Sequence, residues 1–270
     1  MIPAPFDYVA AESTTHALDL LDSFGEDAKL LAGGHSLLPM MKLRLATPSV
    51  LIDIGRLTEL TGIRAEGEEL VIGAATPHAT LATSDLVRAD APLLAHSAAQ
   101  VGDPQIRHRG TIGGSLAHAD PAADLPLALV ALGGSVDLLG QGGTRNVPAD
   151  DFFAGFFETS LDPGELIAAV RVPRRPGTPW GYQKFVRRAN DWAIVGVAAI
   201  DGRIALANMG PTPLRASAAE QALADGAGPA EAAGLAAEGT EPGEDMHADR
   251  EYRRHLARVL TRRALEHQAG

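Results

Sequence analysis

The 270-residue chain contains no cysteine, and this absence excludes several kinds of chemistry. Without thiols the chain can form no disulfide, thiolate zinc site, iron–sulfur cluster or cysteine nucleophile of its own. Aromatic residues are also scarce at 4%, with two Trp, three Tyr and seven Phe. In such a chain, an aromatic side chain beside a candidate binding segment is therefore informative.

Positive charge is in the minority. The chain has 23 Lys and Arg against 34 Asp and Glu, which gives a formal net charge of −11 at pH 7. A surface of this charge repels phosphate backbones and anionic lipids. We therefore expect neither nucleic acid nor a membrane surface as a partner.

Long apolar runs and signal-like segments are missing as well. The longest apolar run, residues 125–136, is interrupted by Pro126, Gly133 and Gly134. It falls far short of the ~20 residues that a transmembrane helix needs. The first 28 residues contain no Lys or Arg, so they lack the charged region of a signal peptide. The sequence predicts a cytoplasmic protein without membrane insertion.

Hydrophobic patterning predicts a mixed α+β chain. Strands over residues 29–32 and 50–54 flank a helix over 37–45, which is a βαβ-type opening. Residues 103–115 carry several charged residues and glycines, and we expect a loop there. The best linker candidate is 173–181, with three prolines and two glycines. After it, we expect strands at 180–187, 193–200 and 203–209, the last two joined by a hairpin turn at Asp201-Gly202.

Two glycine-pair segments share the same chemistry. Residues 33–36 read Gly-Gly-His-Ser, and residues 111–115 read Thr-Ile-Gly-Gly-Ser. Glycine permits left-handed backbone and close approach of a ligand, and successive N–H groups in such a turn can form an anion-binding nest. Either pair can instead be an ordinary turn, and neither matches the GxGxxG or GxxxxGK[ST] fingerprints. The residues alone indicate a phosphate-binding site, with two plain turns as the alternative.

Longer stretches around both segments resemble one family. They read AGGHSLLPMMKLR at 32–44 and IRHRGTIGGSLAHADPAADLP at 106–126. Both are similar to the FAD-binding medium subunit of the molybdenum hydroxylases, the group of carbon monoxide dehydrogenase, xanthine dehydrogenase and aldehyde oxidoreductases. Further matches are LDPGELI at 161–167, the Lys184–Arg188 strand, PTPLR at 211–215 and the arginine-rich last helix.

The resemblance implies a set of cofactor-binding residues. The two glycine segments match the family loops that hold the FAD pyrophosphate, and Asp124 matches an acid that contacts the cofactor. Lys184 matches a lysine near the flavin. Trp192 stands where carbon monoxide dehydrogenase-type subunits place a tyrosine against the flavin face, and Leu161 is expected near the same ring. The implied set is Ala32, Gly33, Gly34, His35, Ser36, Leu37, Thr111, Ile112, Gly113, Gly114, Ser115, Asp124, Leu161, Lys184 and Trp192.

Each implied role has a plainer alternative. Asp124 can be a first-turn carboxylate that satisfies helix N–H groups, Lys184 a surface-strand lysine and Trp192 a core residue. His35 departs from the commoner Gln of the family, and we expect it to hydrogen-bond near FAD that is held non-covalently. No histidines show metal-ligand spacing, and no Ser/His/Asp arrangement has support. We therefore expect neither a metal site nor a catalytic side chain within this chain.

The fold implied by the resemblance is a PCMH-type FAD-binding fold of two α/β subdomains plus a C-terminal domain. We expect FAD-binding subdomains at residues 1–55 and 56–175. A C-terminal medium-subunit domain would follow at residues 176–270, with a three-stranded antiparallel sheet and helices. The linker candidate at 173–181 independently favours the second boundary.

The function implied is that of an electron-transfer subunit. By resemblance, substrate is hydroxylated at a molybdenum cofactor in a large subunit, electrons cross [2Fe–2S] clusters in a small subunit, and the FAD of this chain passes them to an external acceptor. The assembly is expected to be a dimer of heterotrimers. Because this chain has no cysteine, its electrons must arrive through a neighbouring polypeptide. The alternatives are a stand-alone flavin-dependent reductase or oxidase on the same fold, and an assembly subunit that has lost its flavin.

Overall fold

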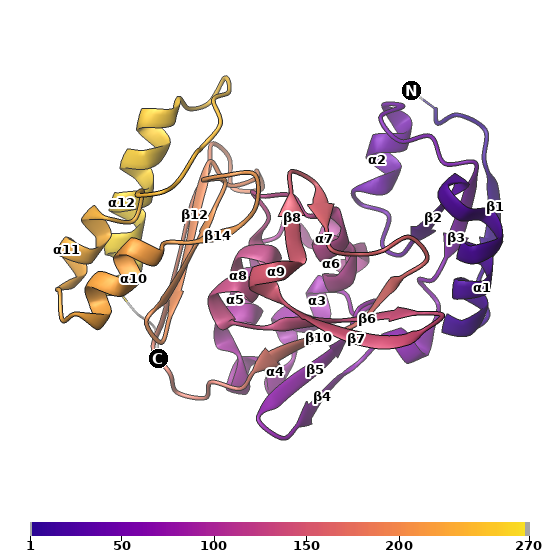
Figure 1. The fold of residues 1–270 in the computed structure, drawn as a ribbon, viewed down its shortest axis with the longest axis horizontal. Helices are drawn as coiled ribbons and strands as arrows, with labels where there is room; N and C mark the ends of the chain where they lie inside the picture. The colour runs from indigo at the N-terminus through magenta and orange to yellow at the C-terminus, as the bar shows by residue number, and fades with distance from the viewer. Residues whose placement is uncertain (1, 268–270) are drawn as a thin grey trace.

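The computed structural model describes residues 2–267, which form three sheet-based units in a row (Figure 1). The first unit is a parallel sheet of order β1-β3-β2, made of Asp7–Ala10, Val50–Asp53 and Ala28–Leu31. Helix α1 (Thr14–Phe24) begins where Ser13 Oγ accepts the N–H of His16 at 3.0 Å. After β2 the chain passes through the first glycine segment into α2 (Leu37–Lys42).

The second unit is a five-stranded antiparallel sheet of order β4-β5-β10-β6-β7. Its strands are Ile63–Glu66, Glu69–Gly73, Leu166–Pro173, Ser135–Gly140 and Gly143–Pro148. Helices pack around it, and the buried apolar side chains of most of them form one core with the sheet. They are α3 (His78–Thr83), α4 (Asp85–Asp90), α5 (Pro92–Ala99), α6 (Pro104–Arg109), α7 (Ile112–His118), α8 (Asp124–Leu132) and α9 (Ala149–Phe152). A small hairpin of β8 (Phe153–Gly155) and β9 (Glu158–Thr159) follows α9.

The prediction of a loop at residues 103–115 is wrong, because two short helices occupy most of this segment. Asp103 Oδ1 accepts the N–H of Ile106 at 2.9 Å, and Pro104 takes the first helical position of α6. Thr111 then caps α7 by accepting the N–H of Gly114 at 3.2 Å. Acidic and hydroxyl caps outweigh the high glycine and charge content of this segment.

The third unit holds the antiparallel sheet β11-β12-β13-β14. Strands β11 (Trp180–Phe185), β12 (Val195–Ile200) and β13 (Arg203–Ala207) are the three expected ones, and the two-residue strand β14 (Leu214–Arg215) adds a fourth at the edge. Both turn residues between β12 and β13, Asp201 and Gly202, have positive φ, as a two-residue hairpin turn requires. Helices α10 (Ser217–Ala224), α11 (Pro229–Gly234) and α12 (Arg250–Glu266) complete the unit.

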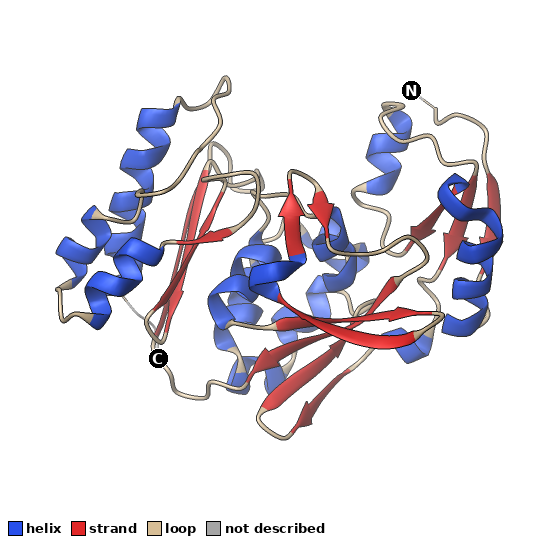
Figure 2. Cartoon of the chain, in the orientation of Figure 1, coloured by secondary structure: helices blue, strands red, loops and turns tan. Residues whose placement is uncertain are grey.

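Every residue of β12 is buried, because the third sheet is covered on both faces. Ala198 and Ile200 join the core built around the second unit, and Val197 and Ala199 join the core formed with α12. This alternation is the two-residue period of a strand. In Figure 2, the helices of the third unit lie on the outer face of this sheet, and helices of the second unit lie on its inner face.

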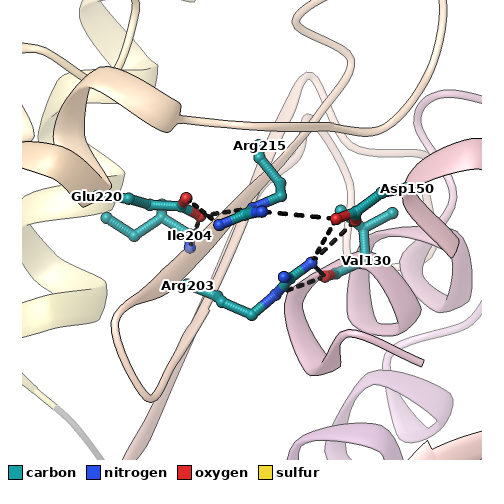
Figure 3. Close-up of polar contacts among 6 residues, drawn as sticks. All are labelled: Val130, Asp150, Arg203, Ile204, Arg215 and Glu220. Atoms are coloured by element: carbon teal, nitrogen blue, oxygen red, sulfur yellow. Dashed lines mark hydrogen bonds and ion pairs between the residues drawn. The ribbon is translucent and has the colours of Figure 1, made fainter. Parts of the chain in front are cut away.

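Polar contacts also fix the third unit against the second (Figure 3). The guanidinium of Arg203 donates to the carbonyl of Val130 at the end of α8 at 2.8 Å, and to Asp150 of α9 at 2.8 and 3.0 Å. Arg215 lies 3.5 Å from the same Asp150 carboxylate and pairs with Glu220. Two arginines therefore share one carboxylate across the boundary. No helix within residues 2–267 is long and apolar enough to cross a membrane.

Candidate cofactor site

A cleft of about 300 Å³ lies where the three units meet. The first unit supplies the glycine segment between β2 and α2, the second supplies residues around α6, α7 and the start of α8, and the third supplies β11 and the loop after it. The predicted residues that line the cleft are Ala32, Gly33, Gly34, His35, Ser36, Leu37, Thr111, Gly114, Ser115, Asp124, Lys184 and Trp192. Residues as far apart as 32 and 192 are thus brought to one cavity.

Three predicted residues lie outside the cleft lining. Ile112 is almost fully buried, and Gly113 is packed so closely on Ala74 that an added Cβ would lie 2.6 Å from the Ala74 Cβ. Both residues build the wall behind Gly114. Leu161 is half-buried and packs on the core of the second unit.

The first glycine segment touches the backbone of residues 109–110, which lead into the second segment. A Cβ on Gly33 would overlap the carbonyl oxygen of Arg109 and lie 2.9 Å from the Cα of Gly110. Gly110 in turn leaves room for the imidazole of His78, whose Nε2 would lie 2.7 Å from an added Cβ. The glycines therefore permit an approach between two main chains that any side chain would prevent.

The two segments differ in the N–H groups they offer. Within residues 2–267, the amides of Gly34, His35 and Ser36 donate to no protein acceptor, so they are free to bind an anion. The second segment uses its amides internally. Ile112 and Gly113 donate to the carbonyls of Thr76 and Ala74 at 3.1 and 2.8 Å, and Gly114 donates to Thr111. The sequence suggested an anion-binding nest in both segments, but only the first segment has the free N–H groups that such a nest requires.

The deep end of the cleft holds a buried ion pair. Lys184 Nζ lies 2.9 Å from Asp124 Oδ2, and the two side chains are 8% and 4% exposed. Lys184 also donates to the carbonyl of Gln100 at 3.3 Å, and the hydroxyl of Tyr182 donates to Asp124 Oδ1. Burial and the neighbouring Asp124 charge raise the pKa of Tyr182 well above its usual value, so its phenol remains a donor. Asp124 is the first residue of α8 and lines the cleft, but within the described residues no helix N–H donates to its carboxylate, so the plainer alternative of a helix-capping carboxylate is wrong.

Sequence reasoning missed one buried histidine in the cleft wall. His78 is 4% exposed, and its Nδ1 is buried without a hydrogen-bond partner within the described residues. Burial lowers its pKa from 6.5 to about 4, with smaller contributions from His35 and Arg107. Nothing in the local sequence marks this residue, because its burial comes from the packing of α3 against Gly110. Further lining residues that were missed include Met40, His118, Asn190 and Asp191.

The low pKa of His78 predicts a loss of stability in mild acid. The unfolded chain takes up a proton near pH 6.5 and the folded chain only near pH 4, so the free energy of unfolding falls as the pH drops through this window. Between pH 6.5 and 5 this group accounts for about 2 kcal/mol. We expect His78→Gln to remove that share of the pH dependence in urea unfolding at pH 7 and pH 5. His247, which is exposed, gives the control variant His247→Gln. If the free energy of unfolding of His78→Gln falls between pH 7 and pH 5 as much as that of the wild type, His78 is not the source of this pH dependence.

The features of the cleft fit FAD. Free amides in the first glycine segment, with hydroxyls of Ser36, Thr111 and Ser115 nearby, suit a pyrophosphate without any lysine. Trp192 is 54% exposed at the cleft, so an aromatic face is available for a planar ring. The buried Lys184 supplies a cation in the wall of the same cleft.

Comparisons with known proteins agree with this fit. Residues 4–175 match the FAD binding domain in molybdopterin dehydrogenase, and residues 180–268 match the CO dehydrogenase flavoprotein C-terminal domain. The chain is 46% identical to the carbon monoxide dehydrogenase medium chain of Hydrogenophaga pseudoflava, over 98% of this chain and 97% of that one. It is 39% identical to the nicotine 6-hydroxylase medium subunit of Paenarthrobacter nicotinovorans, over 96% and 95%.

Solved structures show the same fold. Carbon monoxide dehydrogenase from Hydrogenophaga pseudoflava, in a form lacking the Mo-pyranopterin moiety of its cofactor, superposes with a TM-score of 0.95 at 48% identity, covering 98% of both chains. The resemblance first indicated by the two glycine segments is thereby confirmed over nearly the whole chain. The chain belongs to the FAD-binding medium subunits of the molybdenum-containing dehydrogenases, the family of carbon monoxide dehydrogenase and xanthine dehydrogenase.

Proposed function

We propose that this chain is the electron-transfer subunit of a heteromeric molybdenum hydroxylase, which receives electrons from [2Fe–2S] clusters of a small partner subunit and passes them to an external acceptor. The observation that carries the proposal is the cleft, where a free-amide glycine segment, a buried ion pair and an exposed tryptophan converge. The absence of cysteine supports it too, because this chain holds no iron–sulfur relay of its own.

The side chains of this chain bind and orient the cofactor rather than perform bond chemistry. When bound, FAD supplies the capacity to accept and release electrons. The amides of Gly34, His35 and Ser36 would hold its pyrophosphate, Trp192 would stack on the ring, and Lys184 would place a positive charge near it. His35 is exposed and would hydrogen-bond near the pyrophosphate, with FAD held non-covalently.

The assembly would supply what this chain lacks. A large subunit would carry the molybdenum cofactor, a small subunit would carry the [2Fe–2S] clusters, and two such heterotrimers would pair in the cytoplasm. Relatives named as medium chains and medium subunits support the division of labour. Within this chain we propose units at 1–55, 56–175 and 176–270. This division is supported by the separation of the three sheets into residues 7–53, 63–173 and 180–215.

Purification from the native host with an affinity tag on this chain tests the proposal. We expect a yellow complex that contains two further polypeptides, with molybdenum and iron in fixed ratio to FAD. Denaturation should release the flavin into the supernatant. The isolated chain should bind FAD and turn over no small substrate. A purified chain that reduces or oxidises a small substrate without partners would instead identify a self-sufficient flavoenzyme.

A further inference from the structure

Tyr182 lies behind the cleft and reaches it only through another residue. Its ring is partly buried in strand β11 beside the imidazole of His96, with ring centroids 5.1 Å apart, and it is absent from the cleft lining. Its hydroxyl donates to Asp124 Oδ1, and no other hydrogen bond of that hydroxyl is present within the described residues. A buried phenol needs such an acceptor, but the choice of a carboxylate in a cofactor cleft has further consequences.

The two oxygens of Asp124 are held by two donors from one strand. Tyr182 and Lys184 stand two residues apart in β11, so both side chains point to the same face of the sheet. Tyr182 binds Oδ1 and Lys184 binds Oδ2 at 2.9 Å. An ammonium on a flexible stem neutralises the carboxylate but fixes only one oxygen. The second donor, on a rigid ring, fixes the plane of the carboxylate.

We propose that Tyr182 is a positioning residue for FAD, which orients the Asp124 carboxylate so that its remaining acceptor sites face the cofactor. The inference rests on the placement of FAD in this cleft. It also connects two parts of the chain, because Tyr182 belongs to the third unit and Asp124 to the second. The docking of the C-terminal sheet and the affinity for FAD thereby depend on the same hydrogen bond.

Titration of FAD into apo variants tests the proposal. We expect Tyr182→Phe to fold as the wild type and to raise the Kd for FAD about tenfold, the usual cost of one hydrogen bond to a charged group. The visible band of the bound flavin should shift as well. Tyr8→Phe is the matched control, because its phenol also donates to an aspartate, Asp53, at 2.5 Å, and neither residue lines the cleft. An unchanged Kd and spectrum in Tyr182→Phe would overturn the inference.

A double-mutant cycle separates positioning from general stability. If Tyr182 acts through Asp124, adding Tyr182→Phe to a chain that already carries Asp124→Ala, which leaves no acceptor at position 124, should change the Kd by less than about twofold. A loss of equal size in both backgrounds would mean that Tyr182 only stabilises the fold, and would overturn the proposal. Failure of the wild type to bind FAD would instead refute the proposed function.

Fluorotyrosine labelling tests the same contact in a chain without substitutions, should Tyr182→Phe fail to fold. The chain has three tyrosines, so 3-fluorotyrosine gives three ¹⁹F resonances. We expect FAD to shift the resonance of Tyr182, whose hydroxyl donates to the lining residue Asp124, and to leave those of Tyr8 and Tyr252 in place. Within the described residues, neither of the latter two hydroxyls is hydrogen-bonded to a residue of the cleft lining. Three unshifted resonances in a chain that binds FAD would overturn the proposal.

Discussion

Replacing Gly33 by alanine is expected to raise the Kd for FAD by at least about 100-fold, which corresponds to ~2.7 kcal/mol. The new Cβ would overlap the carbonyl oxygen of Arg109 and lie 2.8 Å from its carbonyl carbon. Because both groups are backbone, neither can rotate away, and the first glycine segment must move away from residues 109–110, which lead into the second segment. The free amides of residues 34–36 then move relative to Thr111 and Ser115, and the anion site loses its geometry. Apo-protein titration with FAD, followed by flavin fluorescence, measures the effect.

The matched control for this substitution is Gly142→Ala. Gly142 has open space around its Cα and lies in the hairpin turn between β6 and β7. It carries the same chemical change without a clash, so its Kd for FAD should equal that of the wild type. Overpacking by the new methyl group in Gly33→Ala is also expected to lower the free energy of unfolding by about 1–3 kcal/mol. Urea unfolding of the apo forms measures this loss of stability separately from the change in Kd. A wild-type Kd in Gly33→Ala would show that the close approach of Gly33 to residues 109–110 is not needed to hold the cofactor.

The sequence predicted the local elements whose signals lie within a few residues. The pattern of residues 193–200 predicted β12, and Asp201-Gly202 predicted the hairpin between β12 and β13. The strand β14 was missed because it has only two residues, and it forms where Leu214 and Arg215 pair with β13. Its existence depends on a partner strand, which no local pattern encodes.

The cleft was predicted well where a motif supplied the residues and poorly where packing did. Both glycine segments come to one cavity, but only the first keeps free amides. Those of the second donate to Ala74 and Thr76, which follow β5, and to Thr111. Glycine content alone cannot distinguish a nest from a helix start that packs closely on a neighbour. Tyr182 was passed over for a similar reason. Its role comes from Asp124, 58 residues away in the chain.

The buried pair of Asp124 and Lys184 gives the second large effect. Lys184→Met keeps most of the side-chain volume but leaves the Asp124 carboxylate, 4% exposed, without its cation. We expect the free energy of unfolding of the apo chain to fall by about 3–5 kcal/mol, because an unpaired buried charge costs more than the pair contributes. Urea unfolding at pH 7 measures the change. Arg262→Met is the control, since Arg262 and Glu266 form an exposed pair and should cost less than about 1 kcal/mol.

Removing both charges distinguishes the contribution of the ion pair to stability from its contribution to FAD binding. The double variant Asp124→Asn with Lys184→Met leaves no buried charge, and Tyr182 can still donate to the amide oxygen at position 124. We therefore expect the double variant to recover most of the stability lost in Lys184→Met, yet to bind FAD more weakly than the wild type. Such a result would mean that the pair is kept for the cofactor rather than for the fold. If Lys184→Met alone unfolds like the wild type, the carboxylate is not held in the buried geometry described for this cleft.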